Sequence, residues 1–500
     1  MKTNYIKFIV PVAALAVTSC IGGTKKPNTK TGFVKVNELS MVSSDLKNIF
    51  APSKGEVKML VIPISFEGAA KNGNSNKYID WTDERIEKMN DYYFGKSDSL
   101  TVYYSVASFN QLHITGMVSP IYQNTTISTT DVLEDGSLQT LFDMIENAVE
   151  WVQENNTDID WSEYDLNDDG CIDNIHLVTN YNTETWSDPL WPHMYHTDRA
   201  GTLDNPLANV YSISATGHVT DAITAIHEQG HIFGLSDYYD YSSQGEGQST
   251  GIDYVGELDM QSHNCFDWNS FSKLSMGWVK PYVINGKAEV TTVNIKAATI
   301  NGDCIIIPAN YDTWNGSAFD EYFLLELFAP YGNNRKDWQK YQAHLGSKPG
   351  IRLYHVDARA YGSNNYSWGG KIRVDDLDEQ QINSKEDIQN WNYISLGTNN
   401  SSNYLDGNNG IEQLADHPLL SIVQKGGNFT FAKENGRHTL SAGDLFKVGD
   451  EFNFEEYSIF LNKQAEEQDT MDNGEEFPYK FVIDYIDEDD ATITFTKIKH

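Results

Sequence analysis

The sequence predicts an α+β protein whose C-terminal half is rich in β-strands. Residues 57–66 form one dense apolar run, as expected for a buried central strand. Residues 136–155 place leucine, isoleucine and valine at helical spacing. From about residue 280, alternating runs are separated by glycine, asparagine and aspartate, which is typical of antiparallel strands. We therefore expect one domain over residues 56–280 and a β-rich domain over residues 281–500.

Three further segments complete the expected elements. Residues 82–95 begin with Thr82 and acidic residues and end at a glycine, which predicts a helix. Residues 174–179 form a short apolar strand. Residues 361–417 are rich in asparagine, serine, glycine and aspartate, and we expect an exposed, loop-rich insertion there.

Composition narrows the class of protein. The chain has 500 residues, of which 40% are hydrophobic, so two or three domains with sizeable cores can form. It carries 71 acidic and 36 basic residues, a net charge of −35. A surface this acidic repels phosphate backbones, so we expect no nucleic-acid partner. The same charge suits a soluble or cation-binding protein.

The N-terminus has the layout of an export signal. Residues 1–20 place two lysines before the apolar run FIVPVAALAVTSC, which is too short to span a bilayer permanently. The stretch ending in Cys20 resembles the lipobox of bacterial lipoproteins. We expect a lipid anchor at Cys20 and a place on the bacterial outer membrane or cell surface. The alternative is an ordinary signal peptide with an incidental cysteine. Residues 21–55 are expected to be a tether or a short pro-segment.

Beyond Cys20, three cysteines remain: Cys171, Cys265 and Cys304. Three cysteines form no zinc finger and at most one disulfide. No spacing favours a particular pair.

The strongest chemical signal is the segment HEQGH, which contains His227, Glu228 and His231. On a helix, the two histidines lie one turn apart on one face, as two imidazoles that share a metal require. Glu228 adjoins the first ligand and is placed to act as general base toward a metal-bound water. The alternative is a helix whose histidines make ordinary hydrogen bonds.

The residues around this helix agree with that interpretation. Thr220 or Asp221 can cap its start, and Gly234 stands where a left-handed residue ends a helix. The chain can then fold back and present Asp237 as the third ligand that an open zinc site needs. Glu257 and Asp240 are the alternative third ligands.

The sequence HEQGHIFGLSDYYD resembles the zinc site of the immune inhibitor A family of metallopeptidases, whose typical form is HExGHxxGLxDxYD. It is also similar to the metzincin pattern, with aspartate in place of the third histidine. Similar blocks lie between residues 57 and 360, namely VKMLVIPISFEG, YDLNDDGCIDNIHLV, LWPH, VGELDM, DWNSFSKLSMGWVKP, EYFLLE and GIRLYHVD. The resemblance implies a zincin- or metzincin-like catalytic domain over residues 56–280 and zinc-dependent cleavage of proteins or peptides.

One position departs from the family pattern. The family and the metzincins place a methionine in a tight turn beneath the metal. Here Met260 follows Asp259, and the best register puts Gln261 at that position. Either the turn is altered or the register is off by one residue.

A second candidate metal site precedes the strand at 174–179. Oxygen-bearing side chains occupy positions 1, 3, 5 and 9 of a calcium-type loop, with Gly170 at position 6. Position 12 is His176 rather than glutamate, so the full EF-hand pattern fails. The alternative is a polar turn that caps the strand. The candidate calcium ligands are Asp165, Asn167, Asp169 and Asp173.

Weaker candidates are aromatic or lie on strands. Tyr238, Tyr239 and Tyr241 either line a substrate cleft or simply pack. His355 could donate a hydrogen bond to a reaction intermediate, although a histidine on a strand is more often structural. Asp357, two residues later, is no stronger a candidate for a functional role.

Together these features predict an exported zinc endopeptidase with Zn²⁺ and a candidate Ca²⁺ as cofactors. We expect a protein or peptide substrate and membrane contact only through the anchor at Cys20. Two alternatives remain open. One is a zinc hydrolase of a non-peptide bond, and the other is a surface lipoprotein that binds glycan or protein with a vestigial peptidase site.

Overall fold

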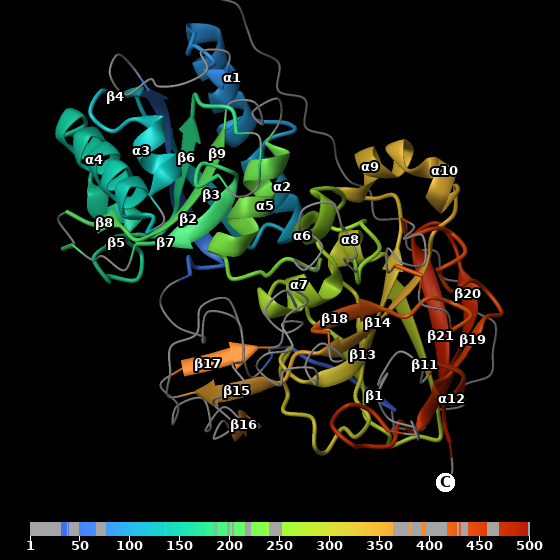
Figure 1. The fold of residues 1–500 in the computed structure, drawn as a ribbon. Coiled ribbons are helices and arrows are strands. Elements are labelled where there is room, and N and C mark those ends of the chain that lie inside the picture. The colour runs from blue at the N-terminus through green and yellow to red at the C-terminus, as the bar shows by residue number, and fades with distance from the viewer. Residues whose placement is uncertain are drawn as a thin grey trace, which may run out of the picture.

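A computed structural model describes residues 32–37, 39, 50–66, 77–135, 137–183, 185, 188–197, 201–202, 205–215, 222–239, 253–363, 380–382, 393–396, 418–427, 430–431, 439–457 and 470–498. Helices and mixed sheets are both present, which confirms the α+β class. Figure 1 shows the N-terminal sheet with its helices on one side of the molecule and the C-terminal sheets on the other. The predicted signal peptide and the anchor at Cys20 lie outside the described residues.

The N-terminal sheet is built around one long buried strand, β2 (Gly55–Phe66). Its strand order is β3-β2-β6-β9-β7, and β4 also pairs with β2. All pairs are parallel except β7 with β9, which is antiparallel. The strands predicted at 57–66 and 174–179 are confirmed as β2 and β6. The other strands span Leu112–Val118 (β3), Tyr122–Asn124 (β4), Ile175–Thr179 (β6), His193–His196 (β7) and Val210–Ala215 (β9).

Helices cover both faces of this sheet because side chains alternate along β2. Val57 and Met59 pack with α1 (Asp83–Phe94), α2 (Leu100–Ala107) and α5 (Ile223–Ile232). Leu60 and Ile62 pack on the opposite face with α4 (Gln139–Asn155), next to α3 (Thr129–Glu134). The predicted helices at 82–95 and 136–155 are confirmed, and Thr82 caps the first.

The C-terminal half contains two sheets packed face to face. A six-stranded sheet has the order β1-β10-β12-β13-β14-β18, and a four-stranded sheet has the order β11-β21-β20-β19. Their pairs are antiparallel except for β10 with β12, so the predicted antiparallel character is confirmed for all but this pair. The strands are Phe33–Lys35 (β1), Tyr282–Ile284 (β10), Val290–Lys296 (β11), Ile305–Ile307 (β12), Glu321–Phe328 (β13), Gly350–Asp357 (β14), Leu420–Ile422 (β18), Glu451–Asn453 (β19), Tyr479–Ile486 (β20) and Asp490–Lys497 (β21).

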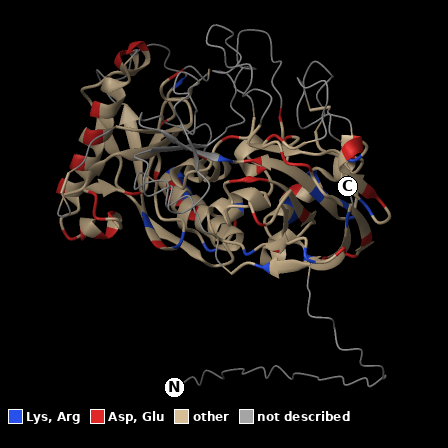
Figure 2. Cartoon of the chain, turned by 90° about the horizontal axis from the view of Figure 1, so that it is seen from below, with Lys and Arg blue, Asp and Glu red and all other residues tan. Residues whose placement is uncertain are grey.

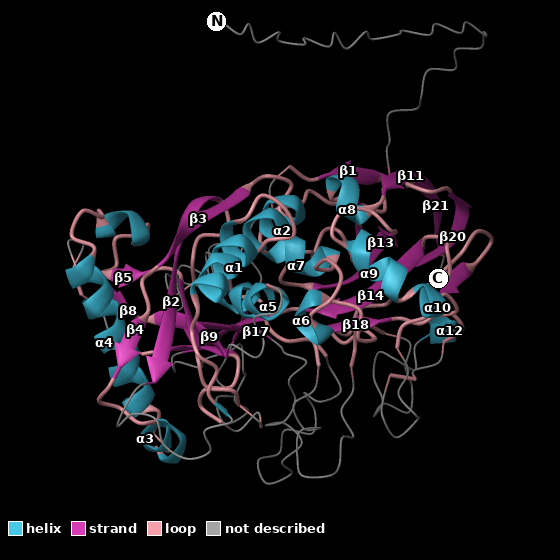
Figure 3. Ribbon diagram, turned by 90° about the horizontal axis from the view of Figure 1, so that it is seen from above, coloured by secondary structure: helices cyan, strands magenta, loops and turns pink. Residues whose placement is uncertain are grey.

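Shorter elements join or flank these layers. Figure 3 shows α6 (Met260–His263) and α7 (Ser270–Ser275) between the N-terminal sheet and the C-terminal sheets. In the predicted insertion, the described residues form a small sheet of Ala360–Ser363 (β15), Gln380–Ile382 (β16) and Tyr393–Leu396 (β17), and the rest lies outside the described residues. The remaining elements are Trp161–Tyr164 (η4), Cys171–Ile172 (β5), Leu207–Ala208 (β8), Ala298–Asn301 (α8), Asn334–Lys340 (α9), Gln342–Leu345 (α10) and Phe454–Tyr457 (α12).

The two halves share one core across residue 280. A single cluster of buried side chains includes Met59 and Phe233 from the N-terminal half and Leu324 and Tyr354 from the C-terminal half. The segment predicted as a tether or pro-segment also enters the fold, because β1 pairs with β10. Farther along, the Ala51 N–H donates to Ile232 O at the end of α5 over 3.0 Å.

Other sequence-based expectations concern cysteines, membrane spans and charge. Cys171, Cys265 and Cys304 are all buried free thiols. Among the described residues, no helix has the length and apolar character needed to cross a membrane. Figure 2 shows acidic residues spread over both halves, and the whole chain has a net charge of −35.

Candidate metal centre

Helix α5 carries the HEQGH segment and ends where the sequence predicts. Gly234 adopts a left-handed backbone, φ 92°, and donates its N–H to His231 O. The Leu235 N–H donates to Gly230 O, so the last turn is closed by a Schellman motif. Ala222 occupies the N-cap position, whereas the predicted caps Thr220 and Asp221 lie outside the described residues.

The turn after α5 brings Asp237 back to both histidines. His227 Nε2 lies 2.9 Å from Asp237 Oδ1, and His231 Nε2 lies 3.5 Å from the same oxygen. The two imidazole rings are 4.9 Å apart and nearly perpendicular. All three side chains are largely withdrawn from solvent. Two nitrogens and one oxygen therefore converge on one small buried space.

The other nitrogen of each ring fixes its tautomer. His227 Nδ1 lies 2.7 Å from Met260 O, and His231 Nδ1 lies 2.7 Å from Leu235 O. A carbonyl oxygen only accepts, so each Nδ1 must carry a hydrogen. In the neutral imidazoles, both Nε2 lone pairs then point at the Asp237 oxygen. Such an arrangement requires a cation between them, either a proton or a metal ion.

The pKa values of the three side chains also favour positive charge on the imidazoles and negative charge on the carboxylate. Burial lowers the pKa of His231, but the charges of Asp237 and Glu228 outweigh it and raise that pKa to about 9. Burial is also the largest single effect on the pKa of His227 and lowers it, but the hydrogen bond to Asp237 and the charges of Asp237 and Glu228 together raise that pKa above its ordinary value. Burial disfavours the Asp237 carboxylate, yet the two imidazoles hold its pKa well below the ordinary value.

Glu228 belongs to the same group of side chains. Its carboxylate lies within 4.8 Å of ligand atoms of both His227 and His231. The side chain is 6% exposed, and burial raises its pKa although the imidazoles pull it down. A buried carboxylate beside the candidate ligands is suited to accept a proton and release it again.

Gln261 occupies the turn beneath the histidines. Its Nε2 lies 3.3 Å from His231 Nδ1, and its Oε1 accepts from Trp268 Nε1 over 3.0 Å. A Cβ on Gly230 would lie 2.2 Å from that Oε1, so a larger residue there would displace the Gln261 amide. The turn beneath the histidines therefore presents the amide of Gln261 to His231 and the carbonyl oxygen of Met260 to His227.

The alternative third ligands have other surroundings. Glu257 accepts a hydrogen bond from Thr439 Oγ1 over 2.6 Å and lies 3.8 Å from His263 Nε2. Asp240 and Tyr241 lie outside the described residues. Tyr238 is buried with its hydroxyl 2.6 Å from Ser272 Oγ, which is a packing role. Tyr239 is half-buried and hydrogen-bonded to Asp237, and burial raises its pKa well above the ordinary value.

Sequence reasoning missed the carbonyls of Leu235 and Met260 that orient the imidazoles. Main-chain acceptors leave no mark in side-chain identity, so no pattern could identify them. Tyr239 was expected either to line a cleft or to pack, and its contact with Asp237 was not expected.

A second buried group contains Glu321, His355 and Asp472. His355 Nε2 lies 2.9 Å from Glu321 Oε1, and the Asp472 and Asn473 N–H groups donate to the same carboxylate over 2.8 and 2.7 Å. Three donors therefore satisfy Glu321 and fasten the turn at 470–476 to β13. His355 therefore makes a structural contact, as is more usual for a histidine on a strand.

The predicted calcium loop folds around its acidic side chains. Asp165 accepts from the Asp169 and Gly170 N–H groups over 3.1 and 2.8 Å, and Asp173 accepts from Leu166 N–H over 2.6 Å. Asn167 Oδ1 lies 3.2 Å from the Asp169 nitrogen. Burial raises the pKa of Asp173 to about 7, and the charges of Asp169 and Asp165 add to it.

This loop does not bring three ligand atoms as close together as His227, Glu228 and His231 do. Two groups of described residues place three ligand atoms within 4.8 Å of one another, and the loop is not among them. His176 is fully buried with its ring nitrogens 2.7 and 2.9 Å from the hydroxyls of Ser212 and Ser214, so it offers no ligand at position 12. Calcium binding here stays a prediction.

No protein-family model and no curated protein matches this chain.

If the loop binds calcium, stability should rise with calcium concentration, because the ion binds only to the folded loop. We expect the melting temperature to be higher in millimolar Ca²⁺ than in EGTA for the unmodified protein. Asp169→Ala should abolish the shift, whereas Asp160→Ala, an equal charge change just before the loop, should keep it. Equal melting temperatures with and without calcium in the unmodified protein would leave the polar-turn interpretation.

Proposed function

We propose that this chain is a zinc-dependent endopeptidase with His227, His231 and Asp237 as metal ligands and Glu228 as general base. The observation that carries the proposal is the convergence of two imidazole lone pairs on one carboxylate oxygen, with each Nδ1 already bonded to a backbone carbonyl. Ligand histidines in metal sites commonly donate their other N–H in this way.

The donor set favours zinc over harder cations. Two imidazoles and one carboxylate are typical of open zinc sites, whereas magnesium and calcium prefer oxygen ligands alone. Bound there, zinc supplies Lewis-acid polarisation of the scissile carbonyl and lowers the pKa of water toward neutrality.

Glu228 performs the proton transfers in this proposal. Its raised pKa keeps it poised to take a proton from the attacking water and to pass that proton to the leaving amine. Its place beside His227, within a buried group, keeps bulk water away from that exchange. Tyr239, hydrogen-bonded to Asp237, helps to hold the carboxylate in place.

The sheet favours a peptide over other substrates. Among the described strands β7 pairs only with β9, so it forms an antiparallel edge, and it contacts α5. An edge strand that contacts the helix of His227 and His231 offers main-chain groups with which an extended peptide can pair. A mixed sheet with such an edge, combined with the HEQGH helix, supports a zincin- or metzincin-like catalytic domain.

Export and anchoring are part of the proposal and rest on residues 1–20. The charged start, the short apolar run and Cys20 favour a lipoprotein of the bacterial outer membrane or cell surface. The acidic composition supports protein or peptide substrates over nucleic acid.

The first test replaces the general base. Glu228→Gln keeps the side-chain shape but cannot accept a proton, so hydrolysis of casein should fall by about 10²–10⁴-fold. Zinc content, measured on the same preparation, should stay at the level of the unmodified protein because Glu228 is not assigned as a ligand. More than a tenth of the original activity would refute the assigned role.

The second test compares two carboxylates near the site. Asp237→Ala should weaken zinc binding by more than the roughly 10–100-fold typical of residues that only support a ligand. Glu257→Ala should leave zinc binding nearly unchanged, because Glu257 contacts Thr439 and His263. Zinc titrations of both variants, read against a competing chelator, provide the comparison. The reverse result would make Glu257 the third ligand.

A further inference from the structure

Glu326 and Arg352 form a buried ion pair on adjacent strands of the six-stranded sheet. They lie opposite one another in the register of β13 and β14, and their side chains are 1% and 3% exposed. Arg352 Nε donates to Glu326 Oε1 over 2.6 Å, and the guanidinium lies 3.9 Å from the centre of the Phe328 ring. A buried charge pair loses its hydration, so it needs further hydrogen bonds to be tolerated.

The alternation of β13 turns this pair toward the N-terminal half. Leu325 and Leu327 pack in the core between the two C-terminal sheets. Leu324 and Phe328 belong to the core that also contains residues of α5. Because successive side chains of a strand point to opposite faces, Glu326 shares the face of Leu324 and Phe328.

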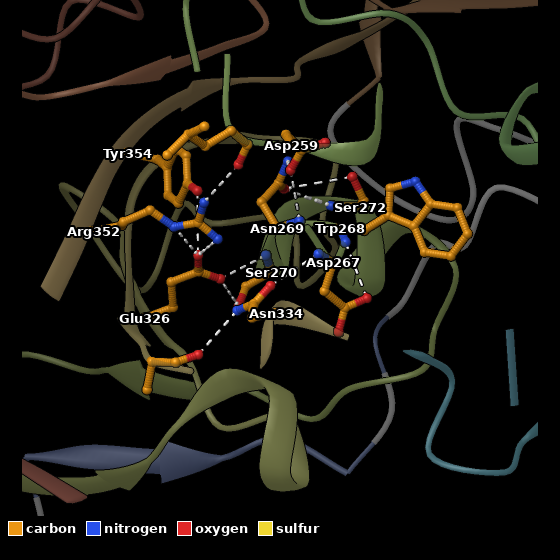
Figure 4. Close-up of polar contacts among 12 residues, drawn as sticks. Asp259, Asp267, Trp268, Asn269, Ser270, Ser272, Glu326, Asn334, Arg352 and Tyr354 are labelled. Carbon is orange, nitrogen blue, oxygen red and sulfur yellow. Dashed lines mark hydrogen bonds and ion pairs between the residues drawn. The ribbon is translucent and has the colours of Figure 1, made fainter. Parts of the chain in front are cut away.

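The Tyr354 hydroxyl on β14 also donates to Glu326 Oε1, over 3.2 Å. The other hydrogen bonds of the pair run to the chain beneath α5. Arg352 Nη1 donates to Leu258 O over 3.2 Å. Glu326 Oε2 accepts from the N–H and the hydroxyl of Ser270 over 2.8 and 2.5 Å. Figure 4 shows the two side chains pointing toward each other, with Ser270 and Asn269 beside them.

Asp259 connects residues 258–261 to the start of α7. Its Oδ2 accepts from both the N–H and the Nδ2 of Asn269 over 2.9 Å, and its Oδ1 accepts from Gln261 N–H over 2.9 Å. Residues 258–261 are therefore held by the C-terminal sheet through Leu258 and by the start of α7 through Asp259.

Residues 258–261 in turn contact the metal centre at two points. Met260 O accepts the Nδ1–H of His227 over 2.7 Å. Gln261 O accepts the N–H of Tyr238, the neighbour of Asp237, over 2.9 Å. A shift of this segment would rotate one imidazole and move the chain that carries the carboxylate.

We propose that the Glu326–Arg352 pair is a positioning element of the zinc site. It fixes residues 258–261, and these residues orient His227 and the segment that carries Asp237. The inference rests on the proposed zinc site and gives the β-rich C-terminal half an indirect part in metal binding, through residues 258–261. Neither residue of the pair contacts the metal ligands itself.

The test removes both charges together, because a single change would leave a buried charge unpaired. The variant is Glu326→Gln with Arg352→Met. The matched control is Asp267→Asn with Lys273→Met. It removes a second buried ion pair, in which the side chains of Lys273 and Asp267 are 1% and 2% exposed. The Lys273 ammonium contacts Asp267 and the Phe109 ring, not residues 258–261.

Three quantities are measured for each folded variant: the melting temperature, the zinc dissociation constant against a chromophoric chelator, and the visible spectrum of the Co²⁺-substituted protein. Both pairs of changes should lower the melting temperature. Only the Glu326–Arg352 variant should weaken zinc binding by about 10–100-fold and shift the cobalt bands, because only it releases the support of His227.

Unchanged zinc affinity and cobalt bands in the folded Glu326–Arg352 variant would overturn the proposal, as would equal losses in the control. Should that variant fail to fold, Arg352→Lys provides the same test. Lysine keeps a cation beside Glu326, but a single nitrogen cannot reproduce the planar fork that reaches both Glu326 and Leu258. Zinc affinity unchanged by Arg352→Lys would also refute positioning. If the unmodified protein binds no stoichiometric zinc, the proposed function itself fails.

Discussion

The contact between two imidazole nitrogens and one carboxylate oxygen is the constraint around which the rest of the structure is arranged. Each of these groups is costly to bury, and together they are tolerated only with a cation among them. The chain supports them from three directions. The Schellman turn after α5 returns Asp237, residues 258–261 hold His227, and the C-terminal sheet holds residues 258–261.

Strand β13 contributes side chains to the core that the two halves share and to the core between the C-terminal sheets. Its odd-numbered residues Phe323, Leu325 and Leu327 fill the core between the C-terminal sheets, and its even-numbered residues Leu324 and Phe328 fill the core shared with α5. One strand therefore forms a wall of both cores. The domain boundary expected near residue 280, where alternating strand patterns begin in the sequence, therefore does not separate two independent cores.

Local patterns made much of the site predictable. The spacing of His227 and His231 follows from helix geometry, and Gly234 signals the helix end, because both depend on residues close in sequence. The supports of the site were not predicted, because they join residues far apart or use main-chain oxygens. Arg352 and Leu258 are 94 positions apart. A signal did exist, since Glu326 and Arg352 each stand between two apolar residues of a buried strand, and charges so buried are usually paired.

The central claim links one metal ion to peptide hydrolysis, and one titration tests that link. Metal-free protein is prepared with a chelator, and casein hydrolysis is followed as zinc is added back. The account predicts no hydrolysis at the start, a linear rise with added zinc, and saturation at one equivalent per chain. Hydrolysis that persists in the metal-free protein, or no hydrolysis at any zinc concentration, would contradict it.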